Sequence, residues 1–190
     1  MDFNSDAFSS AQMQSKLWLV GKLEFYMNDY MPTDSSNGYR IWILGGWYGL
    51  TNLLIRARNN IAVAEVRSFD IDPTCEPIAD AINNLWVWQA WQFKAVTCDV
   101  NKLDYRPKPD IVINSAVEHM TSNEWWNNIP EGVVVCLQAS DMDHDDHSNV
   151  FSNTREMLEK YQMQECFYEG TKRFQYDDYA FNRYMIIGVK

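Results

Sequence analysis

Apolar residues along this chain follow two alternating spacings. Between residues 9 and 30 they recur at steps of three and four, which predicts a helix that buries one stripe of side chains. Ser9 and Gln12 fit a capping box at the start of this helix. A polar break at 32–38 follows it. The stripe expected to be buried consists of Met13, Leu17, Val20, Leu23 and Met27.

Beyond this break, short apolar runs bounded by glycine and polar residues alternate with helical spacing, which predicts strands separated by helices. The strands are expected at 39–44, 61–70, 93–98, 110–115, 132–138, 163–169 and 184–189. The intervening helices are expected at 50–58, in a long stretch from 73 to about 91, and in two shorter stretches that begin near 121 and 153.

Side chains at the expected helix starts fit capping patterns. Asp72 is placed to cap a helix whose first residue is Pro73. Two further capping boxes are formed by Thr121 with Glu124 and by Asn153 with Glu156.

Tryptophans are concentrated at two places. Trp86, Trp88 and Trp91 fall on the long helix, and we expect them in the core. Trp125 and Trp126 are neighbours, and adjacent residues of one helical turn do not face the same way. We therefore expect one of this second pair to line a pocket or an interface, and favour the pocket.

The run 133–137 is entirely apolar, as in a strand that is covered on both faces of a parallel sheet. No helix separates the last two strands, so they are expected to pair antiparallel. The predicted fold is therefore α/β: a Rossmann-like, doubly wound and mostly parallel sheet with a C-terminal antiparallel hairpin and helices on both faces. We expect one domain at 39–190, with the helical segment 1–38 packed against it.

Composition narrows the classes of function. The 190 residues are 46% hydrophobic, enough for one substantial core. The net charge of -10 argues against binding to duplex nucleic acid. No stretch is apolar enough to cross a membrane, and no secretory signal opens the chain, so we expect a soluble cytoplasmic protein. The four cysteines, Cys75, Cys98, Cys136 and Cys166, form no close pair and are expected to be reduced and mostly buried.

Three segments place candidate ligand-binding groups where strands are expected to end. They are the glycine turn at 43–49, the acidic stretch at 69–73 and the stretch at 96–100. The carboxyl ends of parallel strands line one crevice, so a glycine turn and two carboxylates delivered there predict a nucleoside site.

The order of elements from 39 to 190 and these motifs resemble class I S-adenosylmethionine-dependent methyltransferases. The resemblance implies that S-adenosylmethionine is the cofactor and that the glycine turn cradles its methionine part. It also implies that Asp70 binds the ribose hydroxyls, that Ile71 covers the adenine, and that Asp99 and the backbone of Val100 contact the adenine amino group. The remaining cofactor-binding positions that it implies are Gly45, Gly46, Trp47, Gly49, Asn114 and Ser115.

The chain departs from the family pattern in the glycine turn. Ile43 stands where an acidic residue is usual, and Trp47 stands where glycine is usual. The Trp47 indole must therefore fold away from the pocket or occupy part of it. The turn and the ending 183–188 are also similar to short methyltransferase-like proteins of tailed bacteriophages, which implies the cytoplasm of a bacterial host.

Candidate acceptor-side residues follow the fourth and fifth predicted strands. Glu118 and His119 lie in the loop where the family brings donor and acceptor together, and either is a candidate proton acceptor. His147 ends a segment rich in aspartate that is expected to face the same crevice.

We also tested that acidic segment for a metal site. The calcium-loop pattern is met only by Asp141, Asp143 and Asp145, because Asp146 and Ser152 stand where glycine and glutamate are required. We therefore expect no metal and interpret the segment as a solvated loop over the acceptor site.

The function predicted from these observations is methyl transfer from S-adenosylmethionine to a small molecule or a protein group. The segment 114–117 lacks the signature of enzymes that methylate base amino groups, which argues against that substrate. A catalytically silent binding module of the same fold, favoured by Trp47, is the main alternative. A nicotinamide-dependent oxidoreductase is a third, which the terminal hairpin disfavours.

Overall fold

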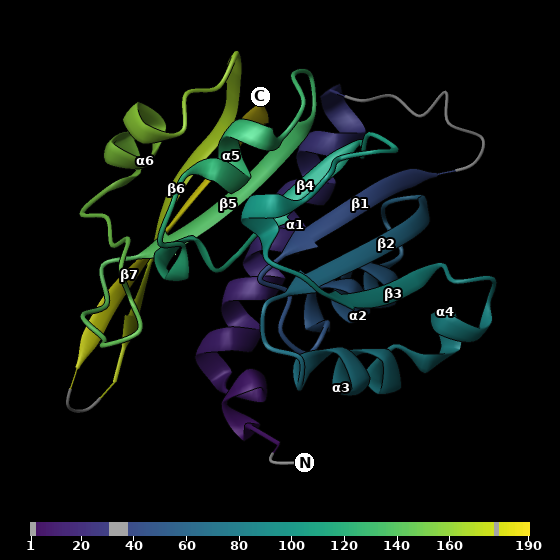
Figure 1. Ribbon diagram of the computed structural model, residues 1–190. Helices are drawn as coiled ribbons and strands as arrows, with labels where there is room; N and C mark the ends of the chain where they lie inside the picture. The colour runs from purple at the N-terminus through teal and green to yellow at the C-terminus, as the bar shows by residue number, and fades with distance from the viewer. Residues whose placement is uncertain (1–2, 31–37, 177–178) are drawn as a thin grey trace.

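A seven-stranded sheet in the order β3-β2-β1-β4-β5-β7-β6 forms the centre of the protein (Figure 1). The computed structural model describes residues 3–30, 38–176 and 179–190. The strands are β1 (Tyr39–Leu44), β2 (Val63–Asp70), β3 (Phe93–Thr97), β4 (Ile111–Asn114), β5 (Val134–Ser140), β6 (Glu165–Gln175) and β7 (Ala180–Val189). The helices are η1 (Ser5–Phe8), α1 (Ser10–Tyr30), α2 (Leu50–Arg58), α3 (Cys75–Ile82), α4 (Asn84–Trp88), η2 (Val100–Lys102), η3 (Val117–His119), α5 (Glu124–Asn128) and α6 (Thr154–Lys160).

Strand directions confirm the predicted fold class. Strands β1 to β5 pair in parallel, and β7 lies antiparallel between β5 and β6. The two C-terminal strands are longer than predicted. The expected polar break lies, apart from Gly38, outside the described residues. None of the helices in the described part of the chain has both the length and the apolarity that crossing a membrane requires.

Alternate side chains of each central strand enter two separate cores. In β1, Ile41 and Ile43 pack with α1 and α2 on one face, whereas Trp42 and Leu44 pack with the α5 and α6 side on the other. Helices on both sides of the twisted sheet are visible in Figure 1. The continuous apolar runs of the central strands follow from this double cover.

The buried stripe of α1 is shifted from the predicted one. Leu17 is exposed, and Lys16 is buried together with Leu19, Val20 and Leu23. The predicted stripe was therefore wrong at Leu17, whereas Val20, Leu23 and Met27 are buried as expected. The side of α1 that faces the sheet is turned slightly from Leu17 toward Lys16 and Leu19.

The long helix expected at 73–91 is broken, and the prediction of three core tryptophans was wrong for Trp88 and Trp91. Trp86 is partly buried and packs against the core. Asn83 is buried between α3 and α4, where its amide donates to the backbone oxygens of Ala79 and Gly49 and interrupts the helix. Trp88 and Trp91 lie beyond this break and are 83% and 58% exposed.

Both residues of the second tryptophan pair are buried, so the expectation that one lines a pocket was wrong. Trp125 and Trp126 are 0% and 6% exposed. Helix α5 is only five residues long, and Tyr161 packs against both indoles at ring distances of 5.3 and 5.4 Å. The two neighbouring indoles are therefore both buried, because the sheet covers them on one side and Tyr161 covers them on the other.

Cap predictions had mixed outcomes. Asn153 caps α6 by accepting from the Glu156 backbone N–H at 3.0 Å, as predicted. Thr121 is not the cap of α5, because Ser122 accepts from the Glu124 N–H instead.

At the other two helix starts, the Ser9 hydroxyl accepts from the Gln12 N–H at 3.4 Å. Asp72 accepts from the Thr74 N–H, and α3 begins three residues after Asp72 rather than at Pro73.

The four cysteines are free, as expected. Cys75 and Cys136 are buried, Cys98 is half-buried and Cys166 is exposed, so only half of them lie in the core.

Candidate functional site

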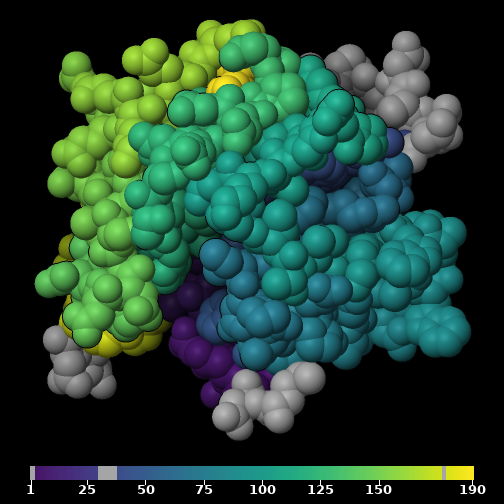
Figure 2. All heavy atoms as spheres, in the orientation of Figure 1, coloured from purple at the N-terminus to yellow at the C-terminus, as the bar shows by residue number. Residues whose placement is uncertain are grey.

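A pocket opens where β1 and β4 end, beside the N-terminal half of α1. It encloses about 360 Å³, including the part open to solvent. The surface is hollowed on this side, where purple N-terminal atoms meet blue and green segments (Figure 2). Its walls come from four separate parts of the chain: Gln12, Lys16, Gly45, Trp47, Ser115, Ala116, Glu118, His119 and Arg183.

The glycine turn after β1 forms one wall. Gly45 has φ +60°, and a Cβ added there would lie 2.8 Å from the Ala116 Cβ, so only glycine fits. The missing side chain of Gly46 instead faces Ser68 on β2. Trp47 adopts φ 48°, a left-handed conformation that normally favours glycine. The backbone thus keeps the geometry of a glycine-rich turn although an indole is present.

The Trp47 indole lies at the border between the pocket and the core. It contributes to the pocket lining and also packs against Tyr48, with ring centroids 5.3 Å apart. The sequence left open whether the indole folds away from the pocket or occupies part of it, and the structure shows some of each.

Asp70 fastens the glycine turn to the end of β2. One carboxylate oxygen accepts from the Trp47 N–H at 2.8 Å, and the other accepts from the Asp72 N–H at 3.1 Å. Each oxygen retains a further lone pair for a ligand. The next residue, Ile71, is 72% exposed and presents an apolar surface beside this carboxylate.

Asp99 follows the adjacent strand and holds η2. Its carboxylate accepts from the backbone N–H of Asn101 at 3.0 Å and pairs with Lys102 at 3.4 Å. The Asn101 N–H lowers the pKa of Asp99. The Cys98 N–H donates to the Asp70 backbone oxygen, so Asp70 and Asp99 lie at the same edge of the sheet. Val100 is buried beside them.

At the end of β4, Asn114 is fully buried. Its amide oxygen accepts from the Ala116 N–H at 3.0 Å. Its amide nitrogen has no hydrogen-bond partner among the described residues. A buried donor without a partner is costly and is commonly satisfied by a ligand or by water. Ser115, the next residue, lines the pocket.

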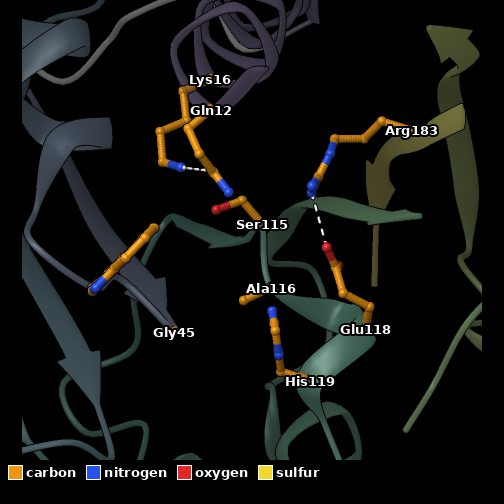
Figure 3. Close-up of a pocket in the computed structure, with 9 residues that line it drawn as sticks. Gln12, Lys16, Gly45, Ser115, Ala116, Glu118, His119 and Arg183 are labelled. Atoms are coloured by element: carbon orange, nitrogen blue, oxygen red, sulfur yellow. Dashed lines mark hydrogen bonds and ion pairs between the residues drawn. The ribbon is translucent and has the colours of Figure 1, made fainter. Parts of the chain in front are cut away.

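Three charged side chains are buried at the far side of the pocket. Glu118 pairs with Arg183 at 3.0 Å, and the side chains are only 2% and 9% exposed (Figure 3). Lys16 donates to the Gln12 side-chain oxygen at 2.6 Å. Burial, and secondly the charge of Arg183, lower the pKa of Lys16 to about 8. The site therefore carries two cations against one carboxylate.

His119 and His147 pack against each other at one side of the pocket. Their ring centroids lie 4.7 Å apart, edge to face. His119 lines the pocket, whereas His147 packs behind it. Asp141 accepts from the Asn182 N–H and from the Tyr184 hydroxyl, so the acidic loop is anchored to β7 at its start. Its other aspartates, Asp143, Asp145 and Asp146, are exposed as expected.

The structure brings together only some of the residues proposed from the sequence. Gly45, Trp47, Ser115, Glu118 and His119 line the pocket. The other proposed positions lie outside its lining: Gly46, Gly49, Asp70, Ile71, Asp99, Val100, Asn114 and His147.

Sequence analysis missed Gln12, Lys16, Ala116 and Arg183. Lys16 gave one signal that could have found it, because it precedes Leu19, Leu23 and Met27 on their helical stripe. A charge on a buried stripe is a candidate functional residue.

No family model matches the chain, and neither does any curated protein. Solved structures do match in fold. The N-methyltransferase NodS from Bradyrhizobium japonicum WM9, in complex with S-adenosylhomocysteine, has a TM-score of 0.66 at 10% identity, covering 95% of this chain and 88% of NodS. Magnesium protoporphyrin IX methyltransferase from Synechocystis PCC 6803, with bound S-adenosylmethionine, has a TM-score of 0.62 at 13% identity, covering 92% and 80%.

The [4+2]-cyclase SpnF also matches, with a TM-score of 0.57 at 12% identity, covering 79% of this chain and 60% of SpnF. The chain therefore has the fold of class I S-adenosylmethionine-dependent methyltransferases. The cyclase shows that this fold alone does not fix the reaction.

Proposed function

We propose that this protein binds S-adenosylmethionine and transfers its methyl group to a small molecule or a protein group. One observation carries the proposal: in this fold, a glycine turn fastened by the Asp70 carboxylate forms the wall of a polar pocket at the carboxyl ends of β1 and β4. That position is where ligands bind in open α/β sheets.

The residues present fit the adenosine part of such a cofactor. Asp70 has lone pairs free to accept from the two ribose hydroxyls. Ile71 offers an exposed apolar face for the adenine ring. Asp99 and the backbone of Val100 are assigned to the adenine edge, at the end of the neighbouring strand.

The pocket itself fits the methionine part. Gly45 allows close approach of the backbone, and Gly46, Trp47 and Gly49 complete the turn. The unpaired amide nitrogen of Asn114 and the adjacent Ser115 supply polar contacts. We assign Lys16, across the pocket from Gly45, to the carboxylate of the bound amino acid (Figure 3).

The chemistry that the bound cofactor supplies is a methyl group on a sulfonium, which is displaced in line by an acceptor. The protein's contribution is to align the acceptor and to exclude water. We place the acceptor against Glu118, His119 and His147, on the side of the pocket away from the glycine turn. Because Glu118 is paired with Arg183, we assign it to holding that guanidinium rather than to accepting a proton.

Calorimetric titration with S-adenosylhomocysteine tests cofactor binding. We expect saturable binding to the unaltered protein and a loss of roughly 10- to 100-fold in Asp70→Ala, as removal of a charge-assisted hydrogen bond is worth about 1.5–3 kcal/mol. Asp104→Ala is the matched control, since Asp104 is a 60% exposed carboxylate paired only locally with Arg106.

The outcomes separate the alternatives. An absence of heat, or equal affinity in Asp70→Ala, would overturn the proposal. Tighter binding of NAD than of S-adenosylhomocysteine would favour an oxidoreductase. Binding without transfer of a labelled methyl group to any small-molecule or protein fraction would favour a silent binding module, for which the indole in the pocket wall is the structural argument.

A further inference from the structure

Three side chains of metal-binding types, one glutamate and two histidines, meet beside the pocket. Glu118, His119 and His147 each offer one ligand atom, and these atoms lie within 4.8 Å of one another. We infer that this cluster binds one divalent transition-metal ion, of the series from manganese to zinc. Two imidazoles with one carboxylate form a ligand set that these ions accept. The ion site does not depend on cofactor binding.

Hydrogen bonds fix both imidazoles in the form that a metal needs. His119 Nδ1 lies 3.2 Å from the Asp146 backbone oxygen, and His147 Nδ1 lies 2.8 Å from the Met142 backbone oxygen. A carbonyl oxygen can only accept, so both Nδ1 atoms carry the proton. In the neutral ring each Nε2 then presents a lone pair. A hydrogen bond from Nδ1 is the usual way in which proteins orient a metal-binding histidine.

One oxygen of the Glu118 carboxylate is also available to bind an ion. Glu118 is 2% exposed, and Arg183 engages its Oε1 only. Oε2 is buried without a hydrogen-bond partner in the described part of the chain. A buried carboxylate oxygen without a partner is unfavourable, and a cation would satisfy it. Arg183 holds the other oxygen and so orients Oε2.

The two segments that supply the ligands are joined before any ion binds. The Glu118 backbone oxygen accepts from the N–H groups of Ser148 and Asn149, both at 3.0 Å. The Asn149 side chain donates to the Val117 oxygen, also at 3.0 Å. Around a small cation, neighbouring ligand atoms lie roughly 3.0–3.5 Å apart. From separations of at most 4.8 Å, the three ligand atoms must therefore approach one another by about 1–2 Å.

The ligand count suggests what the ion can do. Three protein ligands leave coordination positions open, as in catalytic rather than structural metal sites. His119 lines the pocket, so these positions face the acceptor side that we propose above. An ion there can bind an oxygen of an acceptor and lower its pKa.

Cobalt binding to the unaltered full chain, followed by visible absorption and by calorimetry, tests the site. We expect one Co²⁺ per chain, and an affinity at least about tenfold lower in His119→Ala and in His147→Ala. His144→Ala is the matched control, because this third histidine lies in the same loop, with its ring 5.3 Å from that of His147, but is not part of the cluster. The His144 Nδ1 accepts from the Asp146 N–H, whereas Nδ1 of His119 and of His147 donates to a backbone oxygen.

A hundredfold excess of Mg²⁺ should leave Co²⁺ bound, because magnesium prefers oxygen ligands. Displacement by Mg²⁺, an equal loss in His144→Ala, full affinity in His119→Ala and His147→Ala, or no binding by the unaltered protein would each overturn the inference. If the variants fail to fold by circular dichroism, anomalous diffraction from a Co²⁺-soaked crystal of the unaltered protein decides. A peak between the three side chains supports the site, and a peak only elsewhere or no peak refutes it.

Discussion

Replacing Lys16 by methionine should make the protein more stable at neutral pH. Lys16 is 7% exposed, and burial, followed by the charge of Arg183, lowers its pKa from 10.5 to about 8. Keeping the ammonium charged in the folded state therefore costs about 3 kcal/mol, at 1.36 kcal/mol for each pH unit. Methionine removes this cost but loses the bond to Gln12, worth about 1 kcal/mol. The expected net gain at pH 7 is about 2 kcal/mol.

The gain should depend on pH in a defined direction. The folded state holds the Lys16 proton more weakly than the unfolded state, so unfolding takes up a proton between pH 8 and 10.5. The free energy of unfolding of the unaltered protein should therefore rise through this pH window, because the cost of the buried Lys16 charge disappears. Lys16→Met lacks this contribution, and its advantage should fall to about zero near pH 10.

Urea unfolding followed by tryptophan fluorescence at pH 7 and pH 10 measures both quantities. Lys22→Met, on the same helix but only half-buried, is the control and should change stability little. The reasoning is refuted if Lys16→Met is less stable at pH 7, or if its advantage is the same at both pH values. The same variant should bind S-adenosylhomocysteine more weakly, because the proposed partner of the amino-acid carboxylate is gone.

Three further substitutions test local features. Gly45→Ala should cost about 1–3 kcal/mol in urea unfolding, owing to its left-handed φ and the approach to Ala116. Gly21→Ala, whose added Cβ would meet only the Arg58 side chain at 3.9 Å, should stabilise by about 0.5–1 kcal/mol. Asn153→Ala should cost about 1 kcal/mol by loss of the α6 cap, and equal stability of this variant in the same assay would contradict the cap. Trp88→Ser should change stability by less than about 0.5 kcal/mol, whereas Trp125→Ala should cost about 3–5 kcal/mol; similar losses in thermal melts would disprove the assigned burial.

The sheet could be predicted from the sequence because its central strands are apolar on both faces and end at polar residues. Runs such as 133–137 leave little choice of structure. Ends and breaks of helices were less predictable. The break at Asn83 depends on its side-chain bonds to Gly49 and Asn52, which lie more than thirty residues away in the sequence. A contact between residues so far apart in the sequence cannot be predicted from a local pattern.

The same distinction applies to the site. Gly45 and Asp70 could be placed together because the ends of adjacent parallel strands must meet. The position of Arg183 beside Glu118 could not be predicted, because it depends on the register of β7 against β5. In that register, Arg183 pairs with Ser140. Likewise, the metal pattern tested within one loop fails, while the cluster that we infer takes Glu118 and His119 from η3 and only His147 from that loop.

A crystal structure of the full chain with S-adenosylhomocysteine would test the central claim most directly. The account predicts ribose hydroxyls bonded to Asp70, the amino-acid part between Gly45 and Lys16, and the sulfur directed toward the side of Glu118 and His119. A ligand bound elsewhere, or a Trp47 indole that fills the pocket while soaked crystals stay empty, would contradict it.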